Sequence, residues 1–373
     1  MLQSIQKILV AKLRHHGDVL LATPVFSVLK EIFPNASVDA YIYKDSLPVL
    51  EGNQSIRKCW PVDRDWKNIS IIKRYKKEIS LLKNIRNEKY DLVINLTEGD
   101  RGAIAAFVSN ARIRIGYDSE GSGMWRKNQC YTHLTRICHR PRHAVEKNLD
   151  VLRCLGIFPE EKQKNLEFFI PHDSMDNVLL QLRIRNWHPY AFIIVHPVSR
   201  WNFKCLPVST ISDLIRQLIS MGNHIILTSS AREEELSMNR EILSSLPISS
   251  SIWDLSGKLS MKEFAALLKI ASLLITIDSF PLHLASALRI PVVAAFGPTS
   301  DITWSPWRHS RSHIVTAHAS CRPCYMAGCG GSRRSVCLEQ ISVDTLMEAI
   351  HKVKSLPCLL YTSDAADERS RVD

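Results

Sequence analysis

The chain has 373 residues, of which 48 are Lys or Arg and 37 are Asp or Glu, so its formal net charge is +11. This length favours two domains, and 45% apolar with 23% charged residues excludes a disordered, collagen-like or disulfide-dense chain. The positive surplus favours an anionic partner, the 10 cysteines fit a reducing cytoplasm, and the absence of a long uncharged stretch argues against secretion or a membrane span.

Short apolar runs alternate with amphipathic ones through the first part of the chain. Residues 7–13, 37–43, 90–96 and 113–117 are expected strands, and residues 19–33 an expected helix. Strands and helices at this spacing indicate βα units around a parallel sheet. The pattern predicts a Rossmann-like domain over residues 1–170.

The same alternation restarts after the two prolines at positions 171 and 189. Expected strands at 191–197, 224–230, 272–279 and 290–297 alternate with expected helices at 210–222, 261–271 and 283–288. This predicts a second doubly wound α/β domain over residues 189–356, with residues 171–188 as the linker region. Facing sheets of this kind bind ligands at the carboxyl ends of their strands.

The first strand-to-helix loop carries a candidate base. Gly17 permits a tight turn or a close backbone approach, and Asp18 follows at the start of the next helix. Asp18 is either a helix cap or a carboxylate that accepts a proton from a substrate hydroxyl. Arg14, His15 and His16 beside it contact an anionic acceptor or are merely solvated. The loop has no GxGxxG, which weakens a dinucleotide-binding interpretation.

The loop after strand 191–197 carries Ser199, Arg200 and Lys204. One hydroxyl and two cations at the carboxyl end of a strand suit a diphosphate. A solvated basic loop is the alternative.

The loop after strand 272–279 holds Asp278 and Ser279, and Pro281 is expected near the first position of a helix that has His283 in its first turn. Backbone N–H groups there favour an anion. Asp278 can accept hydrogen bonds from sugar hydroxyls, whereas His283 is equally compatible with a packed helix residue.

Three acids, Glu233, Glu234 and Glu235, follow strand 224–230. We expect one of them to hold a ribose or sugar hydroxyl and the others to be acids favoured at a helix start. The segment 255–259, which ends at Leu259, is expected to line a nucleobase pocket.

These motifs, in this order, resemble those of glycosyltransferase family 9, the lipopolysaccharide heptosyltransferases, and especially its heptosyltransferase III branch. The resemblance covers about residues 5–355 and rests on RHHGDVLLATP at 14–24, NLTEGDRGA at 95–103, HPVSRWNFKCLP at 196–207, DSFPLH at 278–283 and FGPT at 296–299. It implies the GT-B fold and an inverting transfer of L-glycero-D-manno-heptose from ADP-heptose to the lipopolysaccharide inner core, without a required metal.

The resemblance also implies roles for residues of this chain. Asp18 looks like the general base, Lys204 and Ser199 like the diphosphate contacts, and Glu233 like the ribose ligand. The implied donor site consists of Ser199, Arg200, Lys204, Glu233, Leu259, Asp278, Ser279 and His283. The implied acceptor site consists of Lys12, Arg14, His15, His16 and Gly17.

Three positions depart from the family pattern. Val198 and Phe280 stand where the family often has Gly, and their side chains narrow the approach to a phosphate or sugar, which bears on donor preference. His16 occupies a position that is often apolar.

Four cysteines lie close together in sequence: Cys321, Cys324, Cys329 and Cys337. Four thiolates suit a tetrahedral structural zinc site, although the spacing departs from paired CxxC motifs. The alternative is a set of free thiols.

Basic residues gather in two stretches of the first domain. Residues 64–89 hold nine Lys or Arg and three acids, and residues 111–143 hold seven and two. Solvated helix faces would explain them, but a phosphorylated, Kdo-bearing lipid acceptor at the inner leaflet predicts peripheral attachment to the inner membrane of a Gram-negative-type bacterium, worth roughly 1 kcal/mol per cation. Nucleic acid is disfavoured because no reader module or stacking motif is present.

Two rival functions remain at the level of sequence: a family 9 transferase with another heptose position or donor, and a non-catalytic nucleotide-sugar-binding relative. Residues 361–373 lack periodicity and look like translated cloning sequence, so we expect them to be non-native. Without their four acids and two bases, 46 basic and 33 acidic residues remain, a net charge of +13.

Overall fold

The computed structural model describes residues 5–356, so the expected foreign tail, 361–373, lies outside the described residues. The first half forms a parallel sheet with the strand order β3-β2-β1-β4-β5-β6. Its strands are β1 (Lys7–Lys12), β2 (Ser37–Tyr43), β3 (Lys58–Val62), β4 (Leu92–Asn95), β5 (Ile113–Tyr117) and β6 (His133–Thr135). The four expected strands are confirmed. Sequence patterns missed β3 and β6, which are the short edge strands; β3 contains Pro61, which an edge tolerates because one side of it pairs with no strand.

Helices connect these strands. They are α1 (His16–Leu20), α2 (Thr23–Ile32), α3 (Leu47–Leu50), α4 (Ile71–Asn87), α5 (Asp100–Ser109) and α6 (Ala144–Cys154), with 3-10 turns η1 (Lys44–Ser46), η2 (Arg64–Asn68), η3 (Lys127–Cys130) and η4 (Glu161–Lys164). The single helix expected over residues 19–33 is two helices. Pro24 lies at the start of α2, where its missing N–H costs nothing, and the break at Leu21 frees the preceding α1 to turn toward the other half.

The second half repeats the plan with the strand order β12-β11-β10-β7-β8-β9. Its strands are β7 (Phe192–His196), β8 (His224–Leu227), β9 (Ile252–Asp254), β10 (Leu273–Ile277), β11 (Val292–Phe296) and β12 (Ser312–Thr316). The connecting elements are η5 (Asn202–Lys204), α8 (Val208–Ser220), α9 (Glu233–Ser244), α10 (Met261–Lys269), α11 (Phe280–Leu288), η6 (Cys329–Gly331), α12 (Val336–Glu339) and α13 (Val343–Ser355). All strands and helices expected in this half are present.

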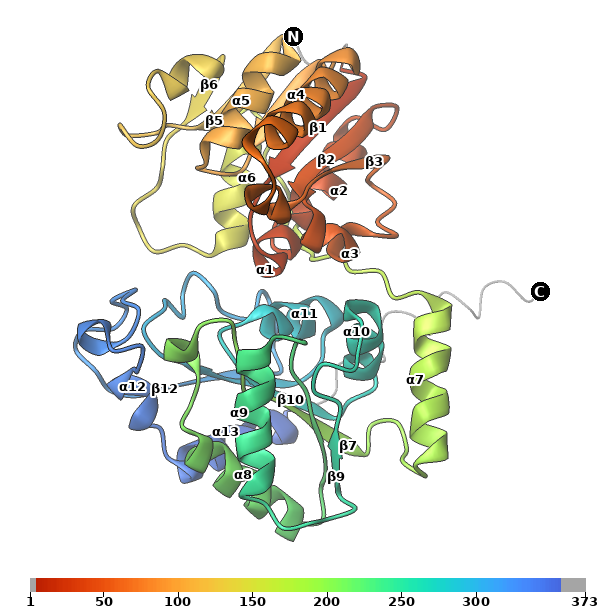
Figure 1. Cartoon of the computed structure of the whole chain (residues 1–373), viewed down its shortest axis with the longest axis vertical. Helices are drawn as coiled ribbons and strands as arrows, with labels where there is room; N and C mark the ends of the chain where they lie inside the picture. Colours follow the sequence, from red (N-terminus) through yellow and green to blue (C-terminus); the bar gives the residue numbers. More distant parts are fainter. Residues whose placement is uncertain (1–4, 357–373) are drawn as a thin grey trace.

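The segment 171–188, expected to be a linker region with a helix between Pro171 and Pro189, does contain that helix. It forms α7 (His172–Ile184), which lies beside α10 of the second half (Figure 1). Val178 and Leu182 of this helix are buried in the same apolar cluster as α10. The second packing unit therefore begins at α7, about where the chain leaves the first half.

Both faces of each sheet are covered. Along β1, Ile8 and Val10 belong to one buried cluster, and Leu9 belongs to another on the opposite face. This alternation follows from the period of two along a strand, and burial on both faces explains why the strands read as continuous apolar runs.

The carboxyl ends of the two sheets face each other. In Figure 1, α1 and α3 of the first half lie against α11 and α10 of the second. One apolar cluster runs through this contact, from Val19 and Leu20 to Leu282 and Leu284. The predicted pair of doubly wound domains that face a cleft is thus confirmed. No helix between residues 5 and 356 combines the length and apolar character that a membrane span requires.

Candidate active site

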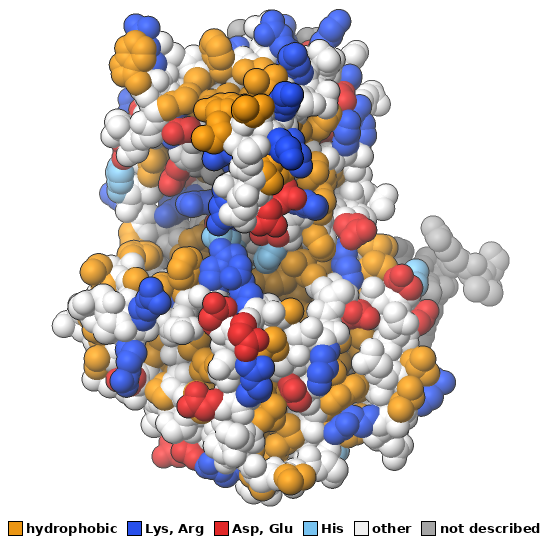
Figure 2. Space-filling model, viewed as in Figure 1, with side chains coloured by type: hydrophobic (Ala, Val, Ile, Leu, Met, Phe, Trp, Pro, Cys, Tyr) orange, Lys and Arg blue, Asp and Glu red, His pale blue; other side chains and the backbone are white. Residues whose placement is uncertain are grey.

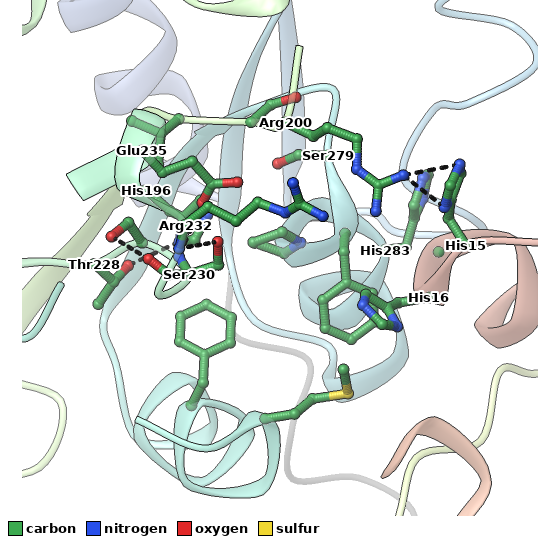
Figure 3. Close-up of a pocket in the computed structure, with 18 of the residues that line it drawn as sticks. His15, His16, His196, Arg200, Thr228, Ser230, Arg232, Glu235, Ser279 and His283 are labelled. Carbon is green, nitrogen blue, oxygen red and sulfur yellow. Dashed lines mark hydrogen bonds between the residues drawn. The ribbon is translucent and has the colours of Figure 1, made fainter. Parts of the chain in front are cut away.

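A cavity of about 460 Å³ lies between the two halves. The loop after β1 supplies one wall, with His15, His16, Gly17 and Asp18. The loops after β7, β8 and β10 supply the other walls (Figure 3). Because all of these loops leave the carboxyl ends of parallel strands, the cavity is where such sheets bind ligands.

Asp18 stands at the junction of two cavities. It lies in the first turn of α1, partly exposed, and it borders both the large cavity and a neighbouring one of about 170 Å³. Trp304 also borders both. A carboxylate in this place can contact two different ligands at once.

The smaller cavity is built mainly from the first half. Lys12 and Arg14 line it, as do Arg136 and Lys147. The Lys12 ammonium donates to the carbonyl oxygen of Leu96 at 3.0 Å and is almost fully buried, and burial lowers its pKa to about 8. The five residues predicted for the acceptor therefore fall into two groups. Lys12 and Arg14 line the smaller cavity, whereas His15, His16 and Gly17 line the larger one.

His15 bridges the two halves. An Arg200 N–H lies 3.0 Å from its Nδ1 atom, and an Arg64 N–H lies 3.3 Å from the same atom. Burial, and then the charges of Arg200 and Arg64, lower the pKa of His15 to about 4. His15 is therefore neutral near pH 7 and can accept from the arginines, so Arg200 reaches across the cleft.

Gly17 and His16 meet helix α11 of the other half. A Cβ atom at Gly17 would lie 2.9 Å from Cδ2 of His283, so only glycine permits this approach. The His16 ring lies 5.8 Å from the Phe280 ring, edge to face, and its Nδ1 atom is 3.3 Å from the Ser46 hydroxyl. Phe280, one of the departures from the family pattern, thus fills the cleft wall beside His16.

Lys204 and Asp278 hold each other. Lys204 Nζ lies 2.7 Å from Asp278 Oδ2, and Asp278 is only 5% exposed. Both line the large cavity with Ser199 and Ser279, and Ser279 is the residue that caps α11. The sequence predicted all four residues in this cavity, and the structure brings them together there; it adds that the ammonium and the carboxylate are paired before any ligand arrives.

His283 is buried in the first turn of α11. Its Nδ1 atom has no hydrogen-bond partner among the described residues. Burial lowers the pKa of its ring, so the ring is neutral near pH 7. A neutral ring at the cavity wall can donate or accept a hydrogen bond without adding charge.

The structure corrects the expectation for Glu233. Its side chain is exposed, pairs with Arg240 and does not line the cavity, so it is not placed to hold a ribose. Glu235 is the glutamate that lines the cavity; it is 7% exposed and accepts a hydrogen bond from the Ser230 N–H at 2.9 Å. Because α9 begins at Glu233, the third helical position is the one whose side chain reaches back over the preceding loop. This preference of the third helical position is the sequence signal that could have pointed to Glu235 once the first residue of the helix is known.

An apolar floor completes the cavity. Leu259 lines it as expected, and Met261 and Phe264 of α10 lie beside it. His196, at the end of β7, shares the wall and bonds through Nδ1 to the Thr228 hydroxyl at 3.0 Å. Sequence reasoning did not single out Met261 and Phe264, because their inward direction depends on how α10 packs, and it assigned no role to His196 at the end of β7.

Positive charge gathers at the cavity mouth. Burial, and then the charges of Arg232 and Arg64, lower the pKa of Arg200. Figure 2 shows Lys and Arg side chains where the surface is hollowed between the halves. Arg232 lines the cavity and forms no ion pair with any described residue, so positive charge remains there for an anionic ligand.

The four clustered cysteines are free thiols. Within residues 5–356, no three His, Cys, Asp or Glu side chains are arranged to hold a metal ion. Cys337 instead packs into the apolar core of the second half, and burial raises its pKa. Cys329, Cys321 and Cys324 lie near enough to Cys337 to act on its pKa, and the structural zinc stays a prediction.

Comparison with known proteins gives one family. A family model described as glycosyltransferase family 9 (heptosyltransferase) matches residues 79–331. The lipopolysaccharide heptosyltransferase 3 of Escherichia coli strain K12 is 33% identical over 297 residues, which cover 79% of this chain and 83% of that protein. A second Escherichia coli protein of that name is 32% identical over 305 residues, 80% of this chain and 85% of its own length.

Solved structures share the fold. A family 9 glycosyl transferase from Veillonella parvula superposes with a TM-score of 0.80 at 21% identity, covering 95% of this chain and 98% of that one. The Escherichia coli heptosyltransferase WaaC with ADP superposes with a TM-score of 0.71 at 17% identity, covering 93% and 100%. At these identities the likeness establishes the two-domain architecture.

Proposed function

The chain belongs to glycosyltransferase family 9 and is a heptosyltransferase of the lipopolysaccharide core, and from this premise we propose that its large cavity holds ADP-heptose, its small cavity holds the acceptor sugar, and Asp18 is the base between them. The position of Asp18 on both cavities carries the proposal. An inverting transfer needs a carboxylate that touches the acceptor hydroxyl while that hydroxyl attacks the anomeric carbon of the donor.

The proposed donor contacts follow the charges of the large cavity. ADP gains negative charge as it leaves, and Lys204, Arg200 and Arg232 are cations already fixed around it. The Ser199 and Ser279 hydroxyls can donate to phosphate oxygens. We propose no metal requirement, because these side chains supply positive charge at the leaving group.

The proposed sugar and base contacts follow from polarity. Asp278, which is paired with Lys204, accepts from donor-sugar hydroxyls, and the neutral His283 bonds to the sugar or a phosphate. Glu235, rather than Glu233, is the proposed ribose ligand. The adenine lies against the apolar floor that includes Leu259.

The proposed acceptor is a phosphorylated, Kdo-bearing inner core, which is attached to lipid. Lys12 and Arg14 in the small cavity suit its negative charge, and Arg136 and Lys147 add to it. We propose that the enzyme works at the cytoplasmic surface of the inner membrane as a peripheral protein, and that nucleic acid is not a partner.

The test is Asp18→Asn. We expect kcat to fall by about 10²- to 10⁴-fold, the usual contribution of a general base, with the Kd for ADP unchanged. The matched control is Asp176→Asn on the exposed face of α7, which should leave both constants as they are. Transfer at the wild-type rate in Asp18→Asn would remove Asp18 from this role.

The acceptor is tested with defined truncated cores and ADP-heptose, by mass spectrometry of the products. Addition of one heptose to a single core type identifies the acceptor position. Binding of ADP-heptose without transfer to any core would instead identify a non-catalytic relative.

A further inference from the structure

Helix α4 is attached to the first domain by a narrow strip. Within its 17 residues, all of which the structure describes, Ile85 is the one fully buried side chain. Four large apolar side chains of the same helix face solvent instead: Ile71 is 72% exposed, Ile72 70%, Tyr75 63% and Ile79 49%. We refer to these four residues as the α4 stripe. Apolar side chains exposed together mark an interaction surface.

The α4 stripe occupies one side of the helix. Its positions lie one, four and eight residues from the first, so at 100° per residue they fall within a narrow sector. By the same geometry Lys76 and Lys83 border the sector on one side, and Arg86 falls within it toward the end of the helix. Figure 2 shows hydrophobic side chains gathered on the front of the upper half, with Lys and Arg side chains near their edge. The helix thus presents an apolar band with a basic margin.

The basic margin is available for a partner. Lys76, Lys83 and Arg86 are exposed, and none forms an ion pair with an acid within the described chain. Lys73 and Arg74 at the start of α4 are likewise exposed and without an acidic partner in residues 5–356. The first basic stretch, 64–89, therefore carries charge that the protein itself does not neutralise.

The second basic stretch, 111–143, is different. Lys127 is buried and pairs with Asp100, and Arg114 donates to the carbonyl oxygens of Cys130 and Ala111. A third cation of this stretch, Arg142, pairs with acids of α6. These three cations maintain the fold, whereas Arg126, Arg136 and Arg140 of the same stretch are exposed. Helix α4 is the stronger candidate for a surface contact because its unpaired cations lie beside the α4 stripe.

The topology places the α4 stripe beside the cleft. Helix α4 follows β3, so it starts at the carboxyl edge of the sheet, the edge that also carries Asp18. The turn that leads into α4 touches this loop directly: Arg64 donates to the Arg14 carbonyl oxygen at 3.1 Å. A flat surface bound to the stripe would lie next to the mouth of the active site.

We propose that the α4 stripe inserts into the interfacial layer of an anionic lipid bilayer, while Lys76, Lys83 and Arg86 contact the headgroup phosphates. A helix with an apolar face and a basic margin lies in that interface, where both parts are satisfied together. That this bilayer is the membrane which carries the lipid-linked acceptor rests on the proposed function, whereas binding of the α4 stripe to a bilayer requires no heptose transfer. It gives a lipid-linked acceptor a short path to Asp18.

The test uses the full chain and vesicles of phosphatidylcholine with or without phosphatidylglycerol, with bound protein measured by sedimentation. The variant Ile72→Ser/Tyr75→Ser/Ile79→Ser should lower the partition coefficient on anionic vesicles by about tenfold or more, at low and high salt, because apolar burial is not screened. The matched control, Leu180→Ser/Ile184→Ser, removes two exposed apolar side chains of α7 and should bind like the wild type.

A charge variant separates the two contributions. Lys76→Glu/Lys83→Glu should weaken binding to anionic vesicles at low salt and leave binding at high salt nearly unchanged. Thermal unfolding of each variant checks that the fold is intact, which we expect since these side chains are exposed.

Activity on a delipidated core oligosaccharide keeps this proposal apart from the proposed function. The stripe variant should transfer heptose to the soluble core at the wild-type rate; failure of the wild type there would overturn the function but not the docking. The docking proposal would be overturned if the wild-type protein did not bind anionic vesicles, or if the stripe variant bound them as the wild type does. A stripe variant that binds vesicles normally but loses a wild-type dimer would identify the face as an interface between copies.

Discussion

At the scale of single residues, the cleft depends on how closely Gly17 of one domain approaches His283 of the other. The two residues are far apart in sequence, and His283 is only 4% exposed, so its ring has little room to move away. The closed arrangement of the domains thus depends on a missing Cβ atom.

We therefore expect Gly17→Ala to lower kcat/KM by about tenfold to a hundredfold, because a displacement near 1 Å misaligns donor and acceptor. The control is Gly99→Ala, where the added Cβ would meet only Thr97 Cγ2 at 3.7 Å. Steady-state kinetics give kcat/KM for both variants, and we expect only Gly17→Ala to be impaired. An unchanged kcat/KM in Gly17→Ala would mean that the domains stand further apart during catalysis.

A second residue-scale prediction concerns pH and His196. Burial lowers the pKa of His196 to about 4, against about 6.5 in an unfolded chain. Between these values the unfolded state binds a proton that the folded state does not, so the contribution of His196 to the free energy of unfolding is constant above pH 6.5 and falls as the pH drops toward 4. For one fully buried ring the loss is on the order of 3 kcal/mol.

We expect His196→Asn, whose amide can still bond to Thr228, to make this decline shallower in urea titrations between pH 7 and pH 4. His188→Asn on the surface should decline like the wild type. The slope will not vanish in His196→Asn, because burial also lowers the pKa of His143 to about 4. Parallel curves for wild type and His196→Asn would contradict a buried, neutral His196.

At the scale of elements, the start of a helix decides which side chains reach the cavity. Helix α10 begins with a capping box: the Glu263 N–H donates to the Ser260 hydroxyl at 3.2 Å, and the Ser260 N–H donates to the Glu263 carboxylate at 2.9 Å. Leu259 and Met261, on either side of this cap, line the donor cavity. The cap therefore stabilises the helix and the proposed adenine site together.

Ser260→Ala should lower the free energy of unfolding by about 1 kcal/mol and raise the KM for the donor. Ser342→Ala removes the comparable cap of α13, which lies outside both cavities, and should cost about the same stability with an unchanged KM. Denaturant titration and donor saturation curves measure the two effects. A donor KM that stays constant in Ser260→Ala would separate the cap from the site.

At the scale of the whole molecule, the two domains are joined by more than the chain connection. Lys262 of α10 donates to the carbonyl oxygens of Glu51 and Phe169, at 2.9 and 2.7 Å. On another part of the contact, His143 bonds to the Ser305 carbonyl oxygen at 2.9 Å. The apolar cluster that includes residues of α1 and α11 belongs to the same interface between the two domains.

We therefore expect a single cooperative transition in calorimetry, and a rise in Tm on addition of ADP, since a ligand of the folded state stabilises all coupled parts. Two separated transitions, of which only one shifts with ADP, would show that the domains unfold independently.

The sequence by itself determined the architecture and most of the proposed site residues. Apolar runs at strand spacing located the central strands, because strands buried on both faces must be apolar throughout. Loop motifs at the ends of these strands located Asp18, Lys204 and Asp278, because parallel topology brings such loops to one edge. Short edge strands such as β3 escaped, since few of their residues are buried and the pattern is weak.

Only the tertiary structure decided what depends on direction and on distant neighbours. Sequence spacing alone did not decide between Glu233 and Glu235, because the rule that favours the third helical position needs the first residue of α9, and a run of three acids leaves that residue open. The pairing of Lys204 with Asp278 joins positions 74 residues apart in the sequence, and no local pattern records it. The same holds for the +11 net charge: the sequence counts it, but the fold neutralises cations such as Lys127 and leaves those of α4 exposed to a partner.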